Sequence, residues 1–566
     1  MAAALVCGIG LLPWLSRTDP ALTVLKARSA DRDPTPEALA AVRDELGLDA
    51  GPSRLLGQWL GGLARGDAGR SWLSGTEVMP AVLQALGVSL TLMTAALVVA
   101  VLTAAAVCAR SMWRGSPREA GTAVLAALPE FLTASVLATV VGVQLGWLPA
   151  LGWYGPQWTV LPAIALGVPT GAVLGRMLDD LLPAALTEPW ALAATGRGIS
   201  RRSLTRQAVR RCLPGVLPNL GLFAVGLTGG SVAVEQVFDI PGIGALTLRA
   251  ALAQDLPVLQ TGSLALVLLA VVAGALARHA APLMLGPALR DGALHSLHRQ
   301  PPPAPRALPL LYGTALLGTI AAGLPRDPLA VDTAARLRPP SWAHPFGTDA
   351  LGRDLLARLA HGAFTTLTAA LLISAATLVA GVLLGLLPRL SGPLVDAVNA
   401  VPPVLSGLLV AGIAGGGPLT PALAVAVVAW SPLATHTSAL LRQERAATHV
   451  AATHALGAGR AYLLRRHLLP AVLPPVARHA LLRVPGIVLA LAALGFLGLG
   501  AQPPSPEWGL LLAENQPYAE RAPWAVLAPA AALAVLGALA VTVAGGVRRP
   551  QRRTAPVRIA IREVPA

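Results

Sequence analysis

Long apolar runs without charged residues recur along this chain, and they constrain its fold more than any other feature. Examples lie near 83–109, 258–285 and 363–388. A run of about 20 apolar residues is the length of helix that crosses a hydrocarbon core about 30 Å thick. Only 13% of the residues are charged, whereas a soluble domain has roughly 25%. The sequence therefore predicts an all-α membrane protein that crosses the bilayer many times.

The apolar runs form two sets of six, separated by a proline-rich linker at 286–306. Three consecutive prolines, Pro301 to Pro303, favour an extended chain there and interrupt any helix. We therefore expect about 12 transmembrane helices, with a first unit at 1–290 and a second at 307–566. The first run, Met1 to Trp14, is short for a span. The expected spans lie near 1–14, 83–109, 120–147, 158–178, 213–236 and 258–285, and near 307–324, 363–388, 394–415, 420–441, 470–499 and 522–546.

The distribution of arginine predicts the orientation in the membrane. The net charge is +15, and Lys26 is the single lysine. Arginines concentrate between the fourth and fifth runs of each unit, within 186–211 and 442–469. Short basic loops face the cytoplasm, so the long polar segment after the first run of each unit is expected on the outside. In this setting the basic charge indicates topology, and we expect no nucleic-acid partner.

Sequence patterns of catalytic or metal sites are not found. Neither HExxH nor GxSxG occurs, and a phosphate-binding loop needs Gly before Lys, whereas Lys26 follows Leu25. Cys7, Cys108 and Cys212 are far apart and have no metal-ligand spacing. We therefore predict no catalytic residue, no metal site and no cofactor in this chain. If ATP drives the protein, another chain hydrolyses it.

Two other classes of membrane protein are compatible with many spans. A secondary transporter also has a six-plus-six repeat, but it needs functional charges at mid-membrane. A membrane-embedded enzyme needs clustered histidines or carboxylates on facing spans, and no such cluster is visible. The ionisable residues in or beside the expected spans are few, and they are Glu130, Asp179, Asp180, Glu235, Asp396, His436 and His479.

Two segments before the fifth spans have the composition of a docking element. The first reads LAATGRG at 192–198 and the second reads AATHALG at 451–457. Small residues let another protein surface approach closely, and the final glycine allows a sharp turn before the next helix. We predict that these segments contact a partner through Ala193, Ala194, Gly198, Ala452 and Gly457.

These segments and five others, in order, resemble one family of importers. The stretches lie at 33–38, 62–71, 234–244, 344–354 and 495–509. Together they make the chain similar to a fused pair of permease subunits of the dipeptide/oligopeptide/nickel family of binding-protein-dependent ABC importers. The two docking segments resemble the EAA motif of that family, the coupling helix that inserts into the ATPase. The chain departs from the motif at Leu192 and Ala451, where the family has glutamate.

The resemblance implies a translocation pathway that alternates between the two sides of a bacterial plasma membrane. The partners would be one or two P-loop ATPase subunits, which carry ATP and Mg, and an extracytoplasmic solute-binding protein. The transported solute would be a di- or oligopeptide, with nickel and other solutes left open. Residues expected to shape the outer loops, either as turns or in a direct role, are Gly66, Asp67, Gly69, Arg70, Asp349, Gly352, Arg353 and Asp354.

Overall fold

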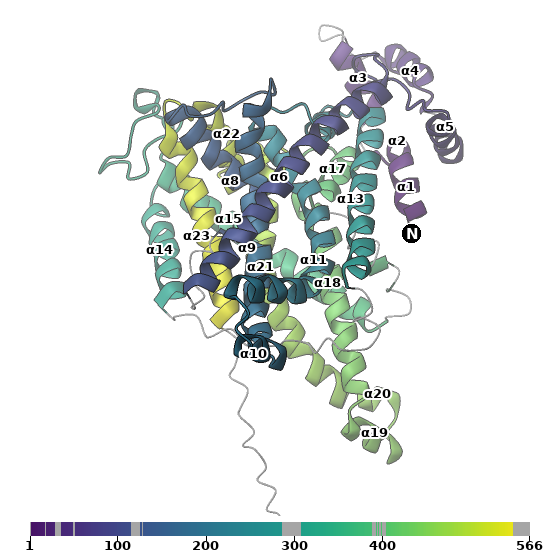
Figure 1. Ribbon diagram of the computed structural model, residues 1–566. Coiled ribbons are helices and arrows are strands. Elements are labelled where there is room, and N and C mark those ends of the chain that lie inside the picture. The colour runs from purple at the N-terminus through teal and green to yellow at the C-terminus, as the bar shows by residue number, and fades with distance from the viewer. Residues whose placement is uncertain are drawn as a thin grey trace, which may run out of the picture.

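A computed structural model shows the chain as a bundle of helices (Figure 1). It describes residues 2–16, 19–28, 35–48, 51–114, 125–126, 128–285, 307–387, 392, 394–395, 398 and 403–546. Within these ranges β pairing is limited to two isolated bridges, Arg70 with Glu77 and Thr348 with Asp354. The expected linker at 286–306 and Asp396 lie outside the described residues.

The first half contains a long polar segment folded as helices and a set of membrane-length helices. The early helices are α1 (Ala2–Gly10), α2 (Leu12–Leu15), α3 (Pro20–Arg28), α4 (Pro36–Glu45) and α5 (Pro52–Ala64). The remaining helices are α6 (Val78–Arg114), α8 (Glu130–Leu137) with its π-helical extension η2 (Ala138–Gln144), α9 (Pro156–Leu186), α10 (Pro189–Gly196), α11 (Arg201–Val237), α12 (Ile243–Leu252) and α13 (Leu256–Leu285).

The second half repeats this order. It contains α14 (Ala307–Gly323), η4 (Thr333–Ala335), α15 (Leu355–Gly385), α17 (Pro403–Ala414), α18 (Thr420–Arg445), α19 (Thr448–Ala455), α20 (Arg460–Leu463), η5 (Leu464–Leu468), α21 (Leu469–Phe496), α22 (Trp508–Asn515), η6 (Gln516–Tyr518) and α23 (Pro523–Gly546). By position, α6, α8, α9, α10, α11, α12 and α13 correspond to α15, α17, α18, α19, α21, α22 and α23.

Seven helices among the described residues are long and apolar enough to cross a membrane. They lie in α6, α9, α13, α15, α18, α20–α21 and α23. The other expected spans are the 37-residue α11, whose first turns are arginine-rich, and shorter apolar helices: α1–α2, α8–η2, α14 and α17. The expected run at 1–14 is therefore two short helices. Each of the two basic stretches begins with a short helix that leads into the next long one; in the first half, α10 ends four residues before Ser200, which caps α11.

Helices α6 and α9 approach each other closely because glycines line one face of α9. Gly167, Gly171 and Gly175 recur at intervals of four residues, the spacing of one helical face. A Cβ atom built on Gly167 would lie 2.5 Å from the carbonyl oxygen of Ala96, and one on Gly175 would lie 2.8 Å from Val107 Cβ. Small residues let membrane helices pack backbone to backbone, so these glycines set the distance between α6 and α9.

The corresponding pair in the second half uses glycines on the other helix. Gly381 and Gly385 lie on α15 and face α18. Cβ atoms at these positions would lie 2.6 Å from the Cβ atoms of Leu433 and Thr437 respectively. The close approach is thus present in both halves. Its glycines lie on α9 in the first half and on α15, the equivalent of α6, in the second.

The two halves contact each other reciprocally. Helix α8 of the first half packs against α23, and the equivalent helix of the second half, α17, packs against α13. Hydrogen bonds accompany both contacts. Gln144 Nε2 donates to the carbonyl oxygens of Ala519 (2.9 Å) and Glu520 (3.0 Å), and Gln254 Nε2 donates to that of Ala411 (2.9 Å). The interface therefore has the arrangement of a pseudo-twofold dimer.

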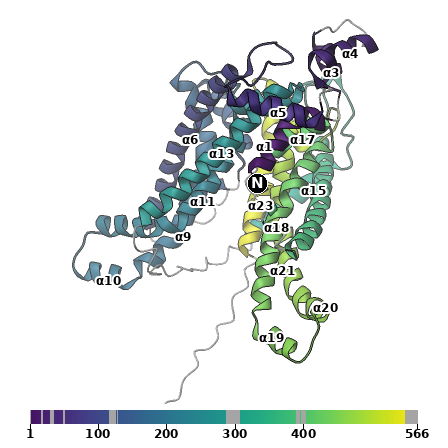
Figure 2. The same ribbon diagram turned by 90° about the vertical axis from the view of Figure 1, so that its right-hand side faces the viewer.

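The halves diverge away from this interface. Figure 2 shows two arms, one with α9, α10 and α11 and the other with α18, α19, α20 and α21, that meet near α17 and separate toward α10 and α19. Helix α10 packs on α9 and α11, and α19 packs on α18 and α20, so each packs within its own half. We call the end with α10 and α19 the basic end, and the end with α12 and α22 the opposite end.

The glycine face of α9 gives a stability prediction. Gly171→Ala places a methyl group against the Ala100 carbonyl oxygen and Thr103, so we expect a loss of about 1–3 kcal/mol from overpacking. Gly226→Ala on α11 is the control, because no atom lies within 4 Å of its Cβ position. Thermal unfolding of the purified protein in detergent measures both. Equal melting temperatures for the two variants would contradict the close approach of α6 and α9.

Candidate coupling helices and pathway seam

Helix α10 is held to the adjacent long helix by one carboxylate. Glu188 precedes α10, and its Oε2 accepts hydrogen bonds from Trp190 Nε1 and Arg211 Nε, each at 2.7 Å. Arg211 lies on α11, so the ion pair joins the start of α10 to the helix that follows it. This contact sets the angle at which α10 projects from the bundle.

Helices α10 and α19 end in the same hydrogen-bonded motif. In α10, the N–H of Gly198 donates to Thr195 O (3.0 Å) and that of Ile199 donates to Ala194 O (3.1 Å). In α19, Gly457 and Ala458 make the equivalent bonds to His454 O (3.0 Å) and Thr453 O (3.3 Å). This is the Schellman motif, which needs a left-handed residue at the glycine. The φ angles are +75° at Gly198 and +91° at Gly457.

The exposed face of each short helix contains some, but not all, of the expected contact residues. Ala193 is exposed on α10, and Ala452 is exposed on α19. Ala194, in contrast, is buried, with 3% of its surface exposed. Its small side chain faces the protein itself, so the face that includes Ala194 cannot be the one that receives a partner. Gly198 and Gly457 are exposed at the helix ends, and their contribution is to the turn.

Leu192 and Ala451 occupy the positions where the EAA motif has glutamate, and both are exposed. Leu192 is 63% exposed on α10, and Leu456, just past α19, is 88% exposed. Apolar side chains this accessible at the basic end are suited to burial against another protein. A partner would therefore meet a leucine where a carboxylate is expected in the first half.

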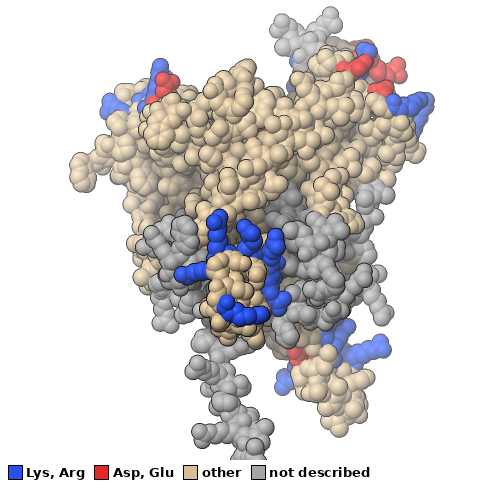
Figure 3. Space-filling model, in the orientation of Figure 1, with Lys and Arg blue, Asp and Glu red and all other residues tan. Residues whose placement is uncertain are grey.

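Arginines surround both short helices. Figure 3 shows a group of blue side chains around α10 and a second group near α19 and α20. The arginines of 197–211 and 442–466 that the sequence assigns to these regions are Arg197, Arg201, Arg202, Arg206, Arg210 and Arg211, and Arg442, Arg445, Arg460, Arg465 and Arg466. Their location at one end of both halves agrees with the expectation that these segments share one side of the membrane.

The second short helix has a different set of contacts. His449 Nε2 lies 3.1 Å from Glu444 Oε1, and the His449 ring is 6.0 Å from that of His467. The half-one equivalent of this region uses the Glu188–Arg211 ion pair instead. Since His449 is charged only when protonated, the two short helices are held by interactions of different chemistry.

At the opposite end, the second half contains a buried group of charges. Asp349 Oδ2 accepts from Arg353 Nε (2.7 Å) and Arg358 Nη1 (2.9 Å), and Glu514 Oε2 lies 2.7 Å from Arg358 Nη2. Arg358 is fully buried on α15, whereas Glu514 lies on α22. The charges therefore fasten the turn before α15 to α22. Arg358 and Glu514 are partners that the sequence analysis did not find.

Gly352 and Asp354 complete that turn. Gly352 has φ +79°, and a Cβ atom there would overlap the carbonyl oxygen of Asp332. Asp354 caps α15 and also accepts from Arg326 Nη1 at 2.7 Å. Burial alone would raise the pKa of Asp354, but hydrogen bonds from the Ala357 N–H, His344 and Arg326 outweigh it, so this pKa lies below its usual value.

The equivalent turn of the first half is more exposed. Gly66 and Gly69 both have φ +80°, and Asp67 Oδ1 accepts from the Gly69 N–H at 2.8 Å. Asp67 and Arg70 are exposed, unlike Asp349 and Arg353. The buried link comes from the next residues, because Asp255 accepts from the Ser71 hydroxyl and from the Trp72 N–H (3.1 Å).

A buried carboxyl group lies against the start of α12 in the first half and against the start of α22 in the second. Glu235 Oε1 accepts from Ser89 Oγ (2.6 Å), and its Oε2 accepts from the Ala245 N–H (2.9 Å) in α12. Glu507 directly precedes α22 and lies against Gly495 of α21. Burial raises the pKa of Glu507 to about 7. The two carboxyl groups lie so close to Gly242 and Gly495 that a side chain at either position would overlap them.

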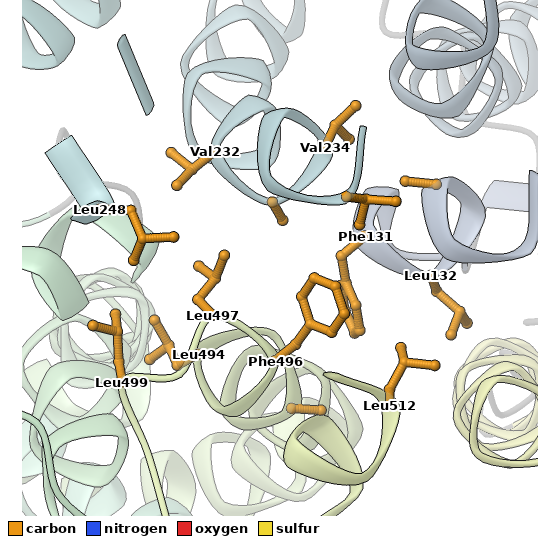
Figure 4. Close-up of a cluster of buried hydrophobic side chains, with 14 of the residues drawn as sticks. Phe131, Leu132, Val232, Val234, Leu248, Leu494, Phe496, Leu497, Leu499 and Leu512 are labelled. Atoms are coloured by element: carbon orange, nitrogen blue, oxygen red, sulfur yellow. The ribbon is translucent and has the colours of Figure 1, made fainter. Parts of the chain in front are cut away.

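The halves meet in an apolar seam. The rings of Phe131 on α8 and Phe496 on α21 are 5.7 Å apart between centroids, and Figure 4 shows them side by side with Leu497 and Leu512 nearby. Phe131, Phe496 and Leu512 are each less than 9% exposed. Apolar side chains from both halves thus fill the space between them near the opposite end.

The other ionisable candidates are scattered. The His436 and His479 rings lie 4.8 Å apart on α18 and α21. Cys7, Cys108 and Cys212 are free thiols. Across the described ranges, no group of three or more His, Cys, Asp or Glu side chains is placed to hold a metal ion.

The buried charges give a matched pair of predictions. Asp349→Ala removes one of the two carboxylates that Arg353 and Arg358 share and leaves Glu514 as the other, and losing one partner of a buried ion pair costs up to about 3–5 kcal/mol. Asp67→Ala removes an exposed carboxylate from the equivalent turn, so we expect a loss below about 1 kcal/mol. Thermal unfolding in detergent measures both. A melting temperature for Asp349→Ala as high as that of Asp67→Ala would refute a stabilising role for the buried group.

The raised pKa of Glu507 predicts a pH dependence of stability. Its ordinary value is 4.5 and its value in the folded protein is about 7, so the folded state binds this proton more tightly than the unfolded chain. The resulting stabilisation is complete below pH 4.5 and is lost as the pH rises through 7. We expect Glu507→Gln to remove this part of the slope of melting temperature against pH. Glu520→Gln, at an exposed site, should keep it, and an unchanged slope in Glu507→Gln would contradict the prediction.

Comparison with known proteins gives two matches of one family within the chain. The family described as "Binding-protein-dependent transport system inner membrane component" matches residues 97–285 and 358–552. The chain is 38% identical over 208 residues to the di/tripeptide transport system permease protein DppC of Pseudomonas aeruginosa, which covers 34% of this chain and 69% of that protein. It is 37% identical over 203 residues to the probable D,D-dipeptide transport system permease protein DdpC of Escherichia coli, covering 34% and 67%. A putative peptide transport system permease of Brucella abortus is 34% identical over 267 residues, covering 44% and 82%.

Proposed function

Because the chain belongs to the family of binding-protein-dependent transport system inner membrane components, we propose that it is the whole permease of an ATP-driven importer, with both permease units in one polypeptide. The observation that carries this proposal is the repetition of the family match in two halves that pack reciprocally. Each half presents one short helix at the basic end. The chain is a multi-pass membrane protein.

The membrane proposed for this permease is the bacterial inner membrane, with the basic end in the cytoplasm. The arginines around α10 and α19 support this orientation. The opposite end, with α3, α4, α5, α22 and the turns before α6 and α15, would then face the outside. The binding protein would deliver its solute there.

The proposed partners at the basic end are two ATPase subunits or domains of other chains, which bind ATP and Mg. Helix α10 offers Leu192 and Ala193, and α19 offers Ala452 with Leu456 beyond its end. Each short helix is joined to a long one, α11 or α21, by a turn with a left-handed glycine. A displacement of α10 or α19 by an ATPase would therefore be passed to a helix that reaches the seam.

In this arrangement we propose that the pathway is closed at the seam. The seam around Phe131 and Phe496 is packed, whereas the arms that hold α10 and α19 are apart (Figures 2 and 4). Drawing the two arms together would strain the seam and favour its opening. ATP and the loaded binding protein would each act by stabilising one of these two arrangements.

The solute that we propose is a di- or oligopeptide. The relatives named as permeases of di/tripeptide, D,D-dipeptide and peptide transport systems support this choice. Pathway residues contributed by this chain are mostly apolar at the seam, which suits weak, transient contact with a passing solute. Selection among peptides is then expected of the binding protein.

Purification of the tagged full-length chain in mild detergent tests this function. We expect mass spectrometry to find one or two P-loop ATPases with it, and Ala193→Cys or Ala452→Cys to form cross-links to them. Uptake of dialanine into proteoliposomes should then require ATP and the binding protein. Recovery of the chain alone from membranes that contain the ATPases, or uptake driven by an ion gradient, would point to a secondary transporter instead.

The left-handed glycines give a prediction for coupling. No atom lies within 4 Å of a Cβ position at Gly457, so a side chain would fit there without a clash. The cost of a substitution comes instead from the left-handed backbone conformation, which costs an L-residue about 1–2 kcal/mol. We expect Gly457→Leu to reduce uptake by about tenfold, a factor equal to 1.4 kcal/mol, with normal amounts of protein in the membrane. Gly457→Asn should retain uptake, because Asn adopts this conformation more readily. Gly198 should behave in the same way.

Wild-type uptake by Gly457→Leu would contradict the assignment of α19 as a coupling helix. Parallel loss in Gly457→Leu and Gly457→Asn would show that the side chain, and not the left-handed turn, is the cause.

A further inference from the structure

The carboxyl group of Glu130 lies between helices at the seam, and no described residue forms an ion pair with it. Glu130 is the first residue of α8 and is partly exposed. Its Cδ would lie 3.1 Å from a Cβ atom at Gly230, so the carboxyl group rests against α11 at a point that no side chain covers. In the described part of the chain, none of the ion pairs includes Glu130.

Two buried carboxylates of the protein have clear structural functions. Glu235 accepts hydrogen bonds that join α11, α6 and α12, and Asp349 pairs with two arginines. Among the described residues, Glu130 makes no comparable hydrogen bond or ion pair between helices. An acidic side chain among membrane-spanning helices is costly and characteristically marks a solute or ion pathway, so its presence here calls for a ligand.

The second half shows that the fold does not need a carboxylate at this position. Helix α17 is the equivalent of α8, and its first residue is Pro403. Leu489 lies seven residues before the end of α21, as Gly230 lies seven before the end of α11. At these two positions the second half thus has apolar residues. The acidic residue and the glycine that exposes it are particular to the first half.

Glu130 is also at the correct depth to meet a solute. Helix α8 continues into η2, which binds the second half at the opposite end through Gln144. Glu130 is therefore the residue of α8 farthest from that end, and it directly precedes Phe131 of the seam. A solute entering from the outside would pass the Phe131–Phe496 contact and then reach Glu130, on the side where the arms diverge.

We propose that Glu130 binds a protonated amine of the transported solute within the pathway. The ammonium N–H groups would donate hydrogen bonds to the carboxylate, and the ionic contact would offset the cost of taking the amine through the apolar seam. The location of the pathway rests on the proposed function. The amine could be the free amino terminus of a peptide or belong to another amine, and the two sources are separable by the choice of probe.

Saturation-transfer difference NMR with the purified complex tests the contact directly, since this method detects weak binding. The probes are dialanine, putrescine and N-acetyl-dialanine, which has no amine. We expect the amine probes to bind wild type, and their dissociation constants to rise about tenfold in Glu130→Gln, as for the loss of one charge-assisted hydrogen bond. Glu130→Asp should retain binding. N-acetyl-dialanine should give the same signal with wild type and Glu130→Gln.

Glu37→Gln is the matched control. Glu37 is likewise an acidic residue in the first turn of a helix, but it is exposed on α4. The Glu37→Gln variant should give the same result as wild type with all three probes. An unchanged melting temperature shows that Glu130→Gln is folded. If binding falls for dialanine alone, the contact serves a peptide terminus, and if it falls for putrescine as well, it serves amines in general.

Equal binding of the amine probes by wild type and Glu130→Gln would overturn the proposal, as would equal losses with Glu37→Gln. Neither outcome depends on ATP hydrolysis or on a binding protein. If no ATPase accompanies the chain, the same comparison is made on the full chain alone. Failure of the importer function and failure of the amine contact are therefore read from different measurements.

Discussion

The two halves are held together near the opposite end, and the arrangement of the other helices follows from this contact. Apolar side chains around Phe131 and Phe496 fill the seam, and reciprocal packing of α8 on α23 and α17 on α13 surrounds it. Near the basic end each half is stabilised from within, by glycine-mediated packing of α6 on α9 and of α15 on α18. Each half can therefore move as a unit about the seam, because its own helices are packed too tightly to slide separately.

The pseudo-symmetry of the halves separates structural features from functional ones. The left-handed glycines at Gly198 and Gly457 occur in both halves with the same hydrogen bonds. The means of holding the short helices differ, since Glu188 pairs with Arg211 whereas Glu444 approaches His449. The two basic-end surfaces are consequently similar in shape and different in chemistry, as expected if each meets a different surface of its partner.

Much of the fold could be predicted from the sequence. Hydropathy indicates where helices cross a membrane, and the arginine-rich loops indicate which helix ends lie on the same side of it. The residues at which the helices begin and end were harder to predict from the sequence. The stretch at 201–212 is polar by composition, yet it continues into α11 because nothing interrupts helical hydrogen bonding there. Within the expected span near 394–415, the described helix α17 covers Pro403–Ala414. The described helices α8–η2 and α17 lie within the expected spans near 120–147 and 394–415 but are shorter than a membrane-length helix.

The candidate site was less predictable, since burial and long-range pairing are not visible in a linear pattern. Ala194 lies within a run of small residues but faces the protein, because a helix turns its residues toward different sides. Arg358 and Glu514 are 156 positions apart and become partners only in the fold. The spacing of Asp349 and Arg353 did indicate a turn, since a carboxylate and a guanidinium four residues apart can pair locally.

The distance between α10 and α19 shows whether the two arms move as units. Spin labels on cysteines placed at the exposed Ala193 and Ala452, in a chain whose Cys7, Cys108 and Cys212 are replaced by serine, report this distance by double electron–electron resonance. In the assembled complex, we expect a long distance without nucleotide and a clearly shorter one when ATP is bound and not hydrolysed. The same distance distribution in both conditions would contradict this expectation.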